Sequence, residues 1–271
     1  MSSRAAWLAI FAGTVLGQEG FRVTPSVRQG ETIEIEAPPG QFKARLGTLT
    51  VPLFAEKGRS VGVLPVVVTH PPGVHRVTIL GEGGRVAHEA KITVADAKYP
   101  IQNIAATKAM KALGPLPGEM EAMTALHRSV TPERKWSRPF GPPVPDCRNS
   151  SFGVLRYHNG KASGNYHRGL DLLSPAGRPV KAAAAGTVKV ARMWRMHGGT
   201  VGIDHGQGVT THYLHLSKIA AQEGQEVRQG DVVGFVGATG FATGPHLHWG
   251  LYVFGVPVNP VQWAPAVPRC Q

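Results

Sequence analysis

The sequence predicts a mainly β protein with an N-terminal β-sandwich, a helical linker and a C-terminal β-sheet-based domain. Short apolar segments alternate with turns through most of the chain, and 34 glycines and 22 prolines supply those turns. The 271 residues allow one large domain or two ordinary ones. Helical composition is confined to a stretch near the middle, so the helices are expected to connect two β domains.

The first 17 residues resemble a signal peptide. Arg4 is followed by an uncharged, mostly apolar run from Ala5 to Gly17. Such a run has the length of a signal-peptide core and is too short to span a bilayer, although a buried N-terminal helix or strand is the alternative. We therefore expect an exported protein of the periplasm or cell envelope, or a secreted one. No other segment is long and apolar enough to cross a membrane, so the mature chain should have no integral membrane span.

Residues 20–97 are expected to form the β-sandwich. Apolar and polar residues alternate from Thr32 to Ala37 and from His75 to Leu80. Val63–Val68 and Lys91–Val94 are further strand candidates, and Pro/Gly-rich turns separate them. Strands at this spacing are typical of a small sandwich.

Residues 98–140 are expected to form a helical linker. Ala105–Leu113 and Glu119–His127 have helical composition, and a Gly/Pro-rich segment at 114–118 separates them. The methionines of this stretch are interpreted as packing residues.

Residues 141–271 return to β composition, with glycine turns between strand candidates. The candidates are Thr187–Ala191, Thr200–Asp204, Val209–Leu214, Val232–Val236 and Leu247–Phe254.

The formal net charge of +12 favours an anionic partner such as a cell wall or a phospholipid surface. The charge forms no basic run, which argues against nucleic acid as the partner.

The two cysteines, Cys147 and Cys270, are too isolated to build a cysteine zinc cluster. In an oxidising compartment they could pair, closing a loop of about 120 residues worth roughly 4–5 kcal/mol. Two unpaired thiols are the alternative, because the sequence does not fix their distance.

Histidines at motif spacing mark the C-terminal domain. His167 and Asp171 lie four residues apart in HRGLD, and His246 and His248 lie two apart in HLH. The two histidines of HLH share one face of a strand, because strand side chains alternate. The segment THYLHL places His215 near the end of another predicted strand.

These residue types suit zinc. A catalytic zinc takes three protein ligands of the His and carboxylate kind and leaves a fourth position open to water. His167, Asp171 and one of the pair His246/His248 could supply the three, and the remaining histidines could transfer protons. No HExxH segment is present, so no helix-borne glutamate is available as a base.

The segments HRGLD, YLHLS and GPHLHW, in this order, resemble the lysostaphin-like (LytM-type) zinc metallopeptidases. The resemblance spans about residues 140–262, and the N-terminal β region resembles an accessory domain found before some of these enzymes. It implies a β-sheet-based fold with an open groove and one zinc ion per chain, held by His167, Asp171 and His248. It also implies that His215 and His246 are the catalytic histidines, without deciding which is the general base.

The resemblance implies a zinc metalloendopeptidase that hydrolyses peptide crosslinks or bridges of bacterial peptidoglycan. The alternative is a non-enzymatic relative that binds the cell wall and activates another hydrolase. The bond cleaved and the oligomeric state are not indicated.

The remaining histidines are interpreted as structural or polar residues. His205 is expected to be structural, whereas His212 should share a strand face with Leu214, away from Tyr213 and His215. The others are expected in loops or as ordinary polar residues: His158 and His197, and His70, His75 and His88. Ser174 lacks the G-x-S-x-G context of a serine hydrolase.

Overall fold

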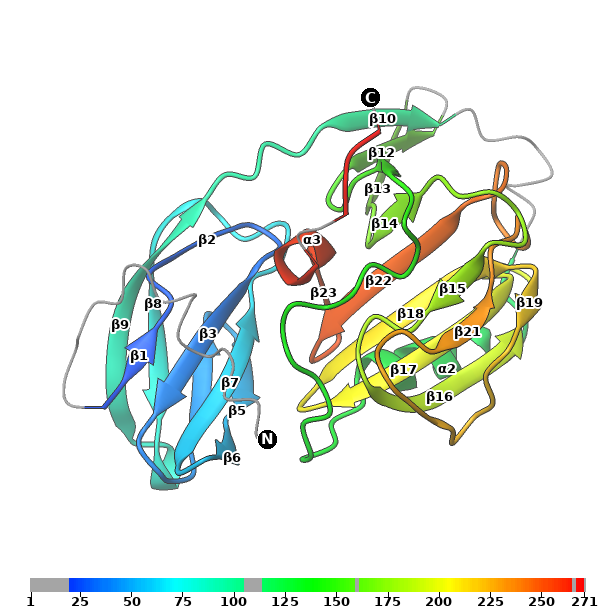
Figure 1. Cartoon of the computed structure of the whole chain (residues 1–271). Coiled ribbons are helices and arrows are strands. Elements are labelled where there is room, and N and C mark those ends of the chain that lie inside the picture. The colour runs from blue at the N-terminus through cyan, green and yellow to red at the C-terminus, as the bar shows by residue number, and fades with distance from the viewer. Residues whose placement is uncertain (1–19, 105–113, 159–160, 265–266, 271) are drawn as a thin grey trace. The chain divides into compact units, whose positions relative to one another are not determined.

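The computed structural model describes residues 20–104, 114–158, 161–264 and 267–270. Its contacts divide the chain into two compact units, Met1–Ala97 and Lys98–Gln271. Strands dominate both units, which confirms the predicted mainly β class (Figure 1). The expected signal peptide lies outside the described residues. Among those residues, no helix combines the length and the apolar character that a membrane span requires.

The N-terminal unit contains two β-sheets. Their strands are β1 (Arg22–Val23), β2 (Ser26–Arg28), β3 (Thr32–Ala37), β4 (Lys43–Leu46), β5 (Leu49–Pro52), β6 (Phe54–Glu56), β7 (Arg59–Pro65), β8 (Gly73–Leu80) and β9 (Val86–Ala95). One sheet has the order β1-β3-β7-β6 and the other β2-β9-β8-β4-β5. Ile33 and Ile35 of β3 and Val77 and Ile79 of β8 are fully or almost fully buried, as alternation predicts for two sheets that share a core. Strand β7 begins earlier than the expected Val63–Val68 run.

The C-terminal unit is built on one large sheet with the order β11-β14-β22-β18-β17-β16-β20. Two three-stranded sheets, β10-β12-β13 and β15-β21-β19, accompany it. The strands of the large sheet are β11 (Arg148–Ser150), β14 (Leu170–Leu172), β16 (Gly186–Met193), β17 (Gly199–Gly206), β18 (Val209–Leu216), β20 (Glu226–Val227) and β22 (Leu247–Val253). The others are β10 (Ile101–Ile104), β12 (Leu155–His158), β13 (Lys161–Tyr166), β15 (Pro179–Lys181), β19 (Lys218–Ile219), β21 (Val232–Phe235) and β23 (Val256–Val258), which pairs with β22.

Helix α2 (Glu119–His127) covers one face of the large sheet (Figure 1). Met123 and Leu126 are buried in one cluster with Val190 of β16 and Leu214 of β18. The buried Glu119 carboxylate also accepts hydrogen bonds from the backbone N–H groups of Leu116, Met196 and His197 and contacts His197 Nδ1 at 2.7 Å. Helix α2 is therefore an integral part of the C-terminal unit.

The opposite face of the same sheet carries aromatic residues. Tyr213 and Trp249 are fully buried there, and Tyr213 Oη accepts a hydrogen bond of 2.8 Å from the backbone N–H of Ala183. Trp263, in the short helix α3 (Pro260–Trp263), packs against Phe140. The alternation of β18 thus sends Leu214 toward α2 and Tyr213 to the other side.

The stretch 98–140 differs from the expected helical linker. The helix at Glu119–His127 is present with the expected bounds, and the proposed helix at 105–113 lies outside the described residues. Residues Ile101–Ile104, however, form strand β10, which pairs in parallel with β12. Because tertiary contacts recruit both β10 and α2, the stretch is part of the C-terminal unit.

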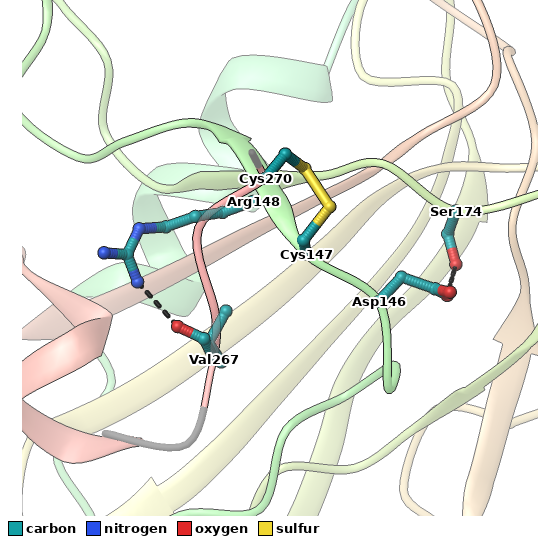
Figure 2. The surroundings of a disulfide bond; sticks show 6 residues. All are labelled: Asp146, Cys147, Arg148, Ser174, Val267 and Cys270. Carbon is teal, nitrogen blue, oxygen red and sulfur yellow. Dashed lines mark hydrogen bonds between the residues drawn. A yellow bond between two sulfur atoms is a disulfide. The ribbon is translucent and has the colours of Figure 1, made fainter.

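The C-terminal tail is fastened to β11. Cys147 and Cys270 form a disulfide across a sequence separation of 123 residues, which confirms the predicted pairing (Figure 2). Arg148 pairs with the tail as well: its backbone N–H donates to Pro268 O at 2.8 Å, and its carbonyl accepts from Cys270 N at 3.0 Å. The Arg148 side chain donates to Val267 O. Strand β11 is therefore fixed on one side by the tail and on the other by β14.

Candidate metal centre

His167, Asp171 and His248 converge on one point. The separations are 3.0 Å from His167 Nε2 to Asp171 Oδ1, 3.1 Å from His167 Nε2 to His248 Nδ1, and 2.8 Å from His248 Nδ1 to Asp171 Oδ1. Within the described parts of the chain, this trio is the one group of histidine, cysteine and acidic residues close enough to hold a metal ion. His248, rather than His246, is the third member of this group.

Strand pairing brings the three residues together. Asp171, in the middle of β14, is the antiparallel partner of His248 in β22, so the two side chains lie side by side on one sheet face. His167 stands in the turn just before β14. A Cβ atom on Gly169 would come within 2.5 Å of Trp249 O and 2.8 Å of His248 Nε2, so only glycine lets this turn approach β22 so closely.

A hydrogen bond to the backbone fixes the orientation of the His167 ring. Its Nδ1 lies 2.9 Å from the carbonyl oxygen of Ser151, which can only accept, so Nδ1 carries the proton. Nε2 is then the nitrogen that faces Asp171 Oδ1 and could ligate a metal ion. Burial alone would raise the pKa of Asp171, but His167 and His248 hold it well below its usual range. The carboxylate oxygen and Nε2 lie 3.0 Å apart, a spacing that a proton on Nε2 or a metal ion shared by the two atoms would stabilise.

A zinc ion fits this donor set. Two imidazoles and one carboxylate are ordinary ligands, and bond lengths of about 2.0–2.2 Å in a tetrahedral shell separate neighbouring ligands by roughly 3.3–3.5 Å. The observed triangle needs to open by only a few tenths of an ångström. Burial also lowers the pKa of His248 to about 4, which keeps that ring neutral and able to ligate at neutral pH.

His215 reaches the same site through an irregularity in β18. Between β17 and β18 the register shifts at Gly199/Val201, which face Leu216 and Tyr213, so β18 carries one extra residue there. His215 has a left-handed φ of 64°, and its ring lies 4.8 Å from that of His246. Regular alternation would turn His215 away from Leu214, so the bulge redirects it toward the metal centre.

The two histidines outside the trio present the same nitrogen to the site. His215 Nδ1 donates to Thr239 O at 2.8 Å, and His246 Nδ1 donates to Gly244 O at 2.8 Å. Nε2 is therefore the nitrogen that each ring turns to the site, and in the neutral tautomer it is the atom that can accept a proton. His246 Nε2 lies 3.9 Å from Asp171 Oδ1. Burial, reinforced by His248 and His246, lowers the pKa of His215 to about 3 and keeps it neutral.

A cavity of about 330 Å³ opens beside the trio. Asp171, His215, His246 and His248 are among its lining residues. Its other walls come from Gln102 and Asn103 of β10, Asn149 and Ser150 of β11, Arg156 of β12, Leu173, and the segment around Phe241 and Thr243–Pro245.

Arg156 is the functional candidate that the sequence did not reveal. Its Nη2 lies 3.5 Å from Asp171 Oδ2, the oxygen that faces away from the trio. No spacing rule connects an arginine on β12 with a carboxylate on β14, so only the fold could bring them together.

Three further histidines of the C-terminal unit make contacts that support the fold. His205 is buried, with Nδ1 2.7 Å from Ala185 O and Nε2 2.8 Å from Thr211 Oγ1. His212 lies on the same strand face as Leu214, as predicted, and its Nδ1 contacts His127 Nε2 of α2 at 2.9 Å. Its ring also lies 5.3 Å from that of His248, so it borders the metal centre from within the core. His197 is a loop residue bound to Glu119, and the Ser174 hydroxyl donates to Asp146 (Figure 2).

Comparisons with known proteins point to one family. The model of peptidase family M23 matches residues 165–260. The chain is 43% identical over 121 residues to the DD-carboxypeptidase/endopeptidase Mpg of Neisseria meningitidis, covering 45% of this chain and 28% of that protein. It is 42% identical over 111 residues to the peptidoglycan DD-endopeptidase ShyA of Vibrio cholerae, covering 41% of this chain and 26% of that protein. The chain thus spans about a quarter of the length of these relatives.

A crystal structure from Pseudomonas aeruginosa assigned to peptidase M23 resembles nearly the whole chain. It superposes with a TM-score of 0.67 at 28% sequence identity, covering 90% of this chain and 95% of that one. The likeness therefore extends over both units, whereas the curated relatives match only part of the chain.

Proposed function

Residues 165–260 form a domain of peptidase family M23, and on that basis we propose that this chain is a zinc metalloendopeptidase acting on bacterial peptidoglycan. The observation that carries the proposal is the His167–Asp171–His248 triangle, in which two imidazole nitrogens and the Asp171 carboxylate converge on one point. The curated relatives named as peptidoglycan DD-endopeptidases support the substrate class.

His167, Asp171 and His248 hold the ion in this proposal, one per chain. Zinc bound there supplies a Lewis acid that polarises the scissile carbonyl and lowers the pKa of a water ligand toward about 7. Arg156 holds Asp171 in position through Oδ2. The carbonyl oxygen of Ser151 holds His167 in position through Nδ1.

His215 and His246 move the protons. Each ring donates from Nδ1 to a backbone carbonyl, so Nε2 is the atom that accepts a proton from the attacking water and returns it to the leaving amine. Their rings lie 4.8 Å apart, which suits a shared role in orienting the water.

The alternative function is a non-enzymatic protein that binds the wall and activates another hydrolase. The filled set of three ligand positions and two further histidines favours hydrolysis, because a binding protein has no need of the Nε2 groups of His215 and His246. We also propose an exported protein of the cell envelope, since its substrate lies there.

Digestion of purified peptidoglycan tests the function. The zinc-loaded chain should create new amino termini, identified by mass spectrometry, and chelation should abolish them. The His246→Ala variant, loaded with zinc to the same stoichiometry, is the matched control and should create none. A folded, zinc-loaded chain that releases no amino termini would favour the non-enzymatic alternative.

A further inference from the structure

The carboxylate of Glu119 is fully buried against the loop that joins β16 to β17. Its Oε1 accepts hydrogen bonds from the backbone N–H groups of Met196 at 3.0 Å and His197 at 2.8 Å, and lies 2.7 Å from His197 Nδ1. A buried carboxylate is costly unless hydrogen bonds satisfy it, so these contacts stabilise one conformation of the loop. Glu119 therefore fixes two consecutive loop residues to helix α2.

The same two loop residues also hold segments that line the cavity beside the metal centre. Met196 O accepts a hydrogen bond of 2.8 Å from the backbone N–H of Phe241, and His197 O accepts one of 3.0 Å from the N–H of His215. Phe241 and His215 both line the cavity. Each loop residue thus joins Glu119 through its N–H group and the cavity wall through its carbonyl oxygen.

His215 depends on such support because of its backbone conformation. Its φ of 64° lies in the left-handed region, which a residue other than glycine keeps only where the surrounding structure holds it. The hydrogen bond to His197 O holds its backbone, and Thr239 O holds its ring through Nδ1 at 2.8 Å. Thr239 packs closely against the loop as well, since a Cβ atom on Gly198 would come within 2.3 Å of Thr239 Oγ1. The loop therefore contacts both groups that orient His215.

We propose that Glu119 is a positioning residue for peptide hydrolysis, which acts through the loop at 196–198 to hold His215 in its working orientation. The inference rests on the proposed function and deepens it. Glu119 precedes residues 165–260, the part that matches the family model. The helix before the family domain thus supplies a contact on which the geometry of a histidine inside that domain depends.

Glu119→Gln tests the role by separating kcat from KM. The variant keeps the size of the side chain and one acceptor oxygen but removes the charge. It should bind zinc like the wild type and lower kcat by about 10–100-fold with little change in KM, because a misplaced proton acceptor weakens only the transition state. The matched control is Glu121→Gln, which removes an exposed charge from the same helix and should leave kcat unchanged.

His197→Ala should slow the reaction less than Glu119→Gln, because both backbone N–H groups of the loop still reach the carboxylate. Wild-type kcat in a zinc-loaded Glu119→Gln variant would overturn the proposal. A loss of activity that only follows a loss of zinc would overturn it too.

Hydrogen exchange followed by NMR separates positioning from general stability. In Glu119→Gln, exchange of the His215 and Phe241 N–H groups should accelerate at least about 10-fold more than exchange in the centre of β17, since their acceptors belong to the released loop. Equal acceleration throughout the C-terminal unit would mean that Glu119 only stabilises the fold, and would overturn the proposal.

The wild-type chain provides a measurement that needs neither a variant nor turnover. The N–H groups of Met196, His197, His215 and Phe241 should open with one common free energy, because the network that joins them to Glu119 opens as a unit. Separate opening free energies for the loop pair and the cavity pair would overturn the proposal even if Glu119→Gln did not fold. A chain that hydrolyses no peptidoglycan but shows the common opening would refute the proposed function and leave the link from Glu119 to His215 standing.

Discussion

Replacing both cysteines by serine should destabilise the C-terminal unit without changing its folded structure. The disulfide joins Cys147 and Cys270 across 123 residues, and loop-entropy reasoning gives about 5 kcal/mol for a crosslink of that length. The backbone pairing of Arg148 with the tail remains in the variant, so the native state keeps its contacts. Removing the disulfide therefore lowers the stability mainly by increasing the conformational entropy of the unfolded chain.

Urea unfolding followed by tryptophan fluorescence measures this loss. Four of the five tryptophans, Trp136, Trp194, Trp249 and Trp263, lie in the C-terminal unit. Trp7 lies outside the described residues, so a Trp7→Phe background confines the signal to this unit. With a denaturant dependence of about 2 kcal/mol per molar, the midpoint should fall by roughly 2 M or more.

All samples should contain a chelator, so that metal binding does not add to the measured stability. A reductant should lower the midpoint of the oxidised parent protein and leave the double serine variant unchanged. Equal midpoints for the oxidised parent and the serine variant, both folded, would refute the entropic reasoning.

Three further predictions concern the metal centre, a buried histidine and the unit boundary. Asp171→Ala should lose zinc in metal analysis, whereas His246→Ala should keep zinc and lose turnover. If Asp171→Ala kept zinc and His246→Ala lost it, His246 would be the metal ligand and Asp171 would not. Burial lowers the pKa of His205 to about 4. The neutral ring therefore contributes its full share of the unfolding free energy above pH 6.5, and about 3 kcal/mol of it is lost as the pH falls toward 4. Unfolding free energies of the wild type and His205→Gln should converge over that range. A shortened chain that begins at Lys98 should fold and bind zinc, whereas one that begins at Lys135 lacks α2 and β10 and should unfold at lower denaturant.

Local patterns predicted the elements that depend on local sequence. The alternation over Thr32–Ala37 and the helical composition of Glu119–His127 match β3 and α2 in their bounds. The period of a strand also placed His246 and His248 on one face, and both line the cavity. These predictions succeeded because hydrophobic period and composition act within a few residues.

Tertiary contacts account for what the sequence did not reveal. Ile101–Ile104 forms a strand because it pairs with β12. Its sequence has no alternating pattern from which a strand could be predicted. The redirection of His215 depends on a register shift between β17 and β18. The contact of Arg156 with Asp171 joins strands of two different sheets. Each of these features is a property of pairs of segments rather than of one segment.

The pairing of β14 with β22 makes metal binding a measure of strand register. Asp171 and His248 are 77 residues apart and meet only because they are direct partners in this ladder. A slip of one residue would turn Asp171 to the opposite face of the sheet and dissolve the triangle, while leaving nearly all of the β structure in place. Molecules that are collapsed but misregistered would thus have native-like circular dichroism and no high-affinity metal. Zinc stoichiometry therefore counts correctly registered molecules, which spectroscopic measures of secondary structure cannot do.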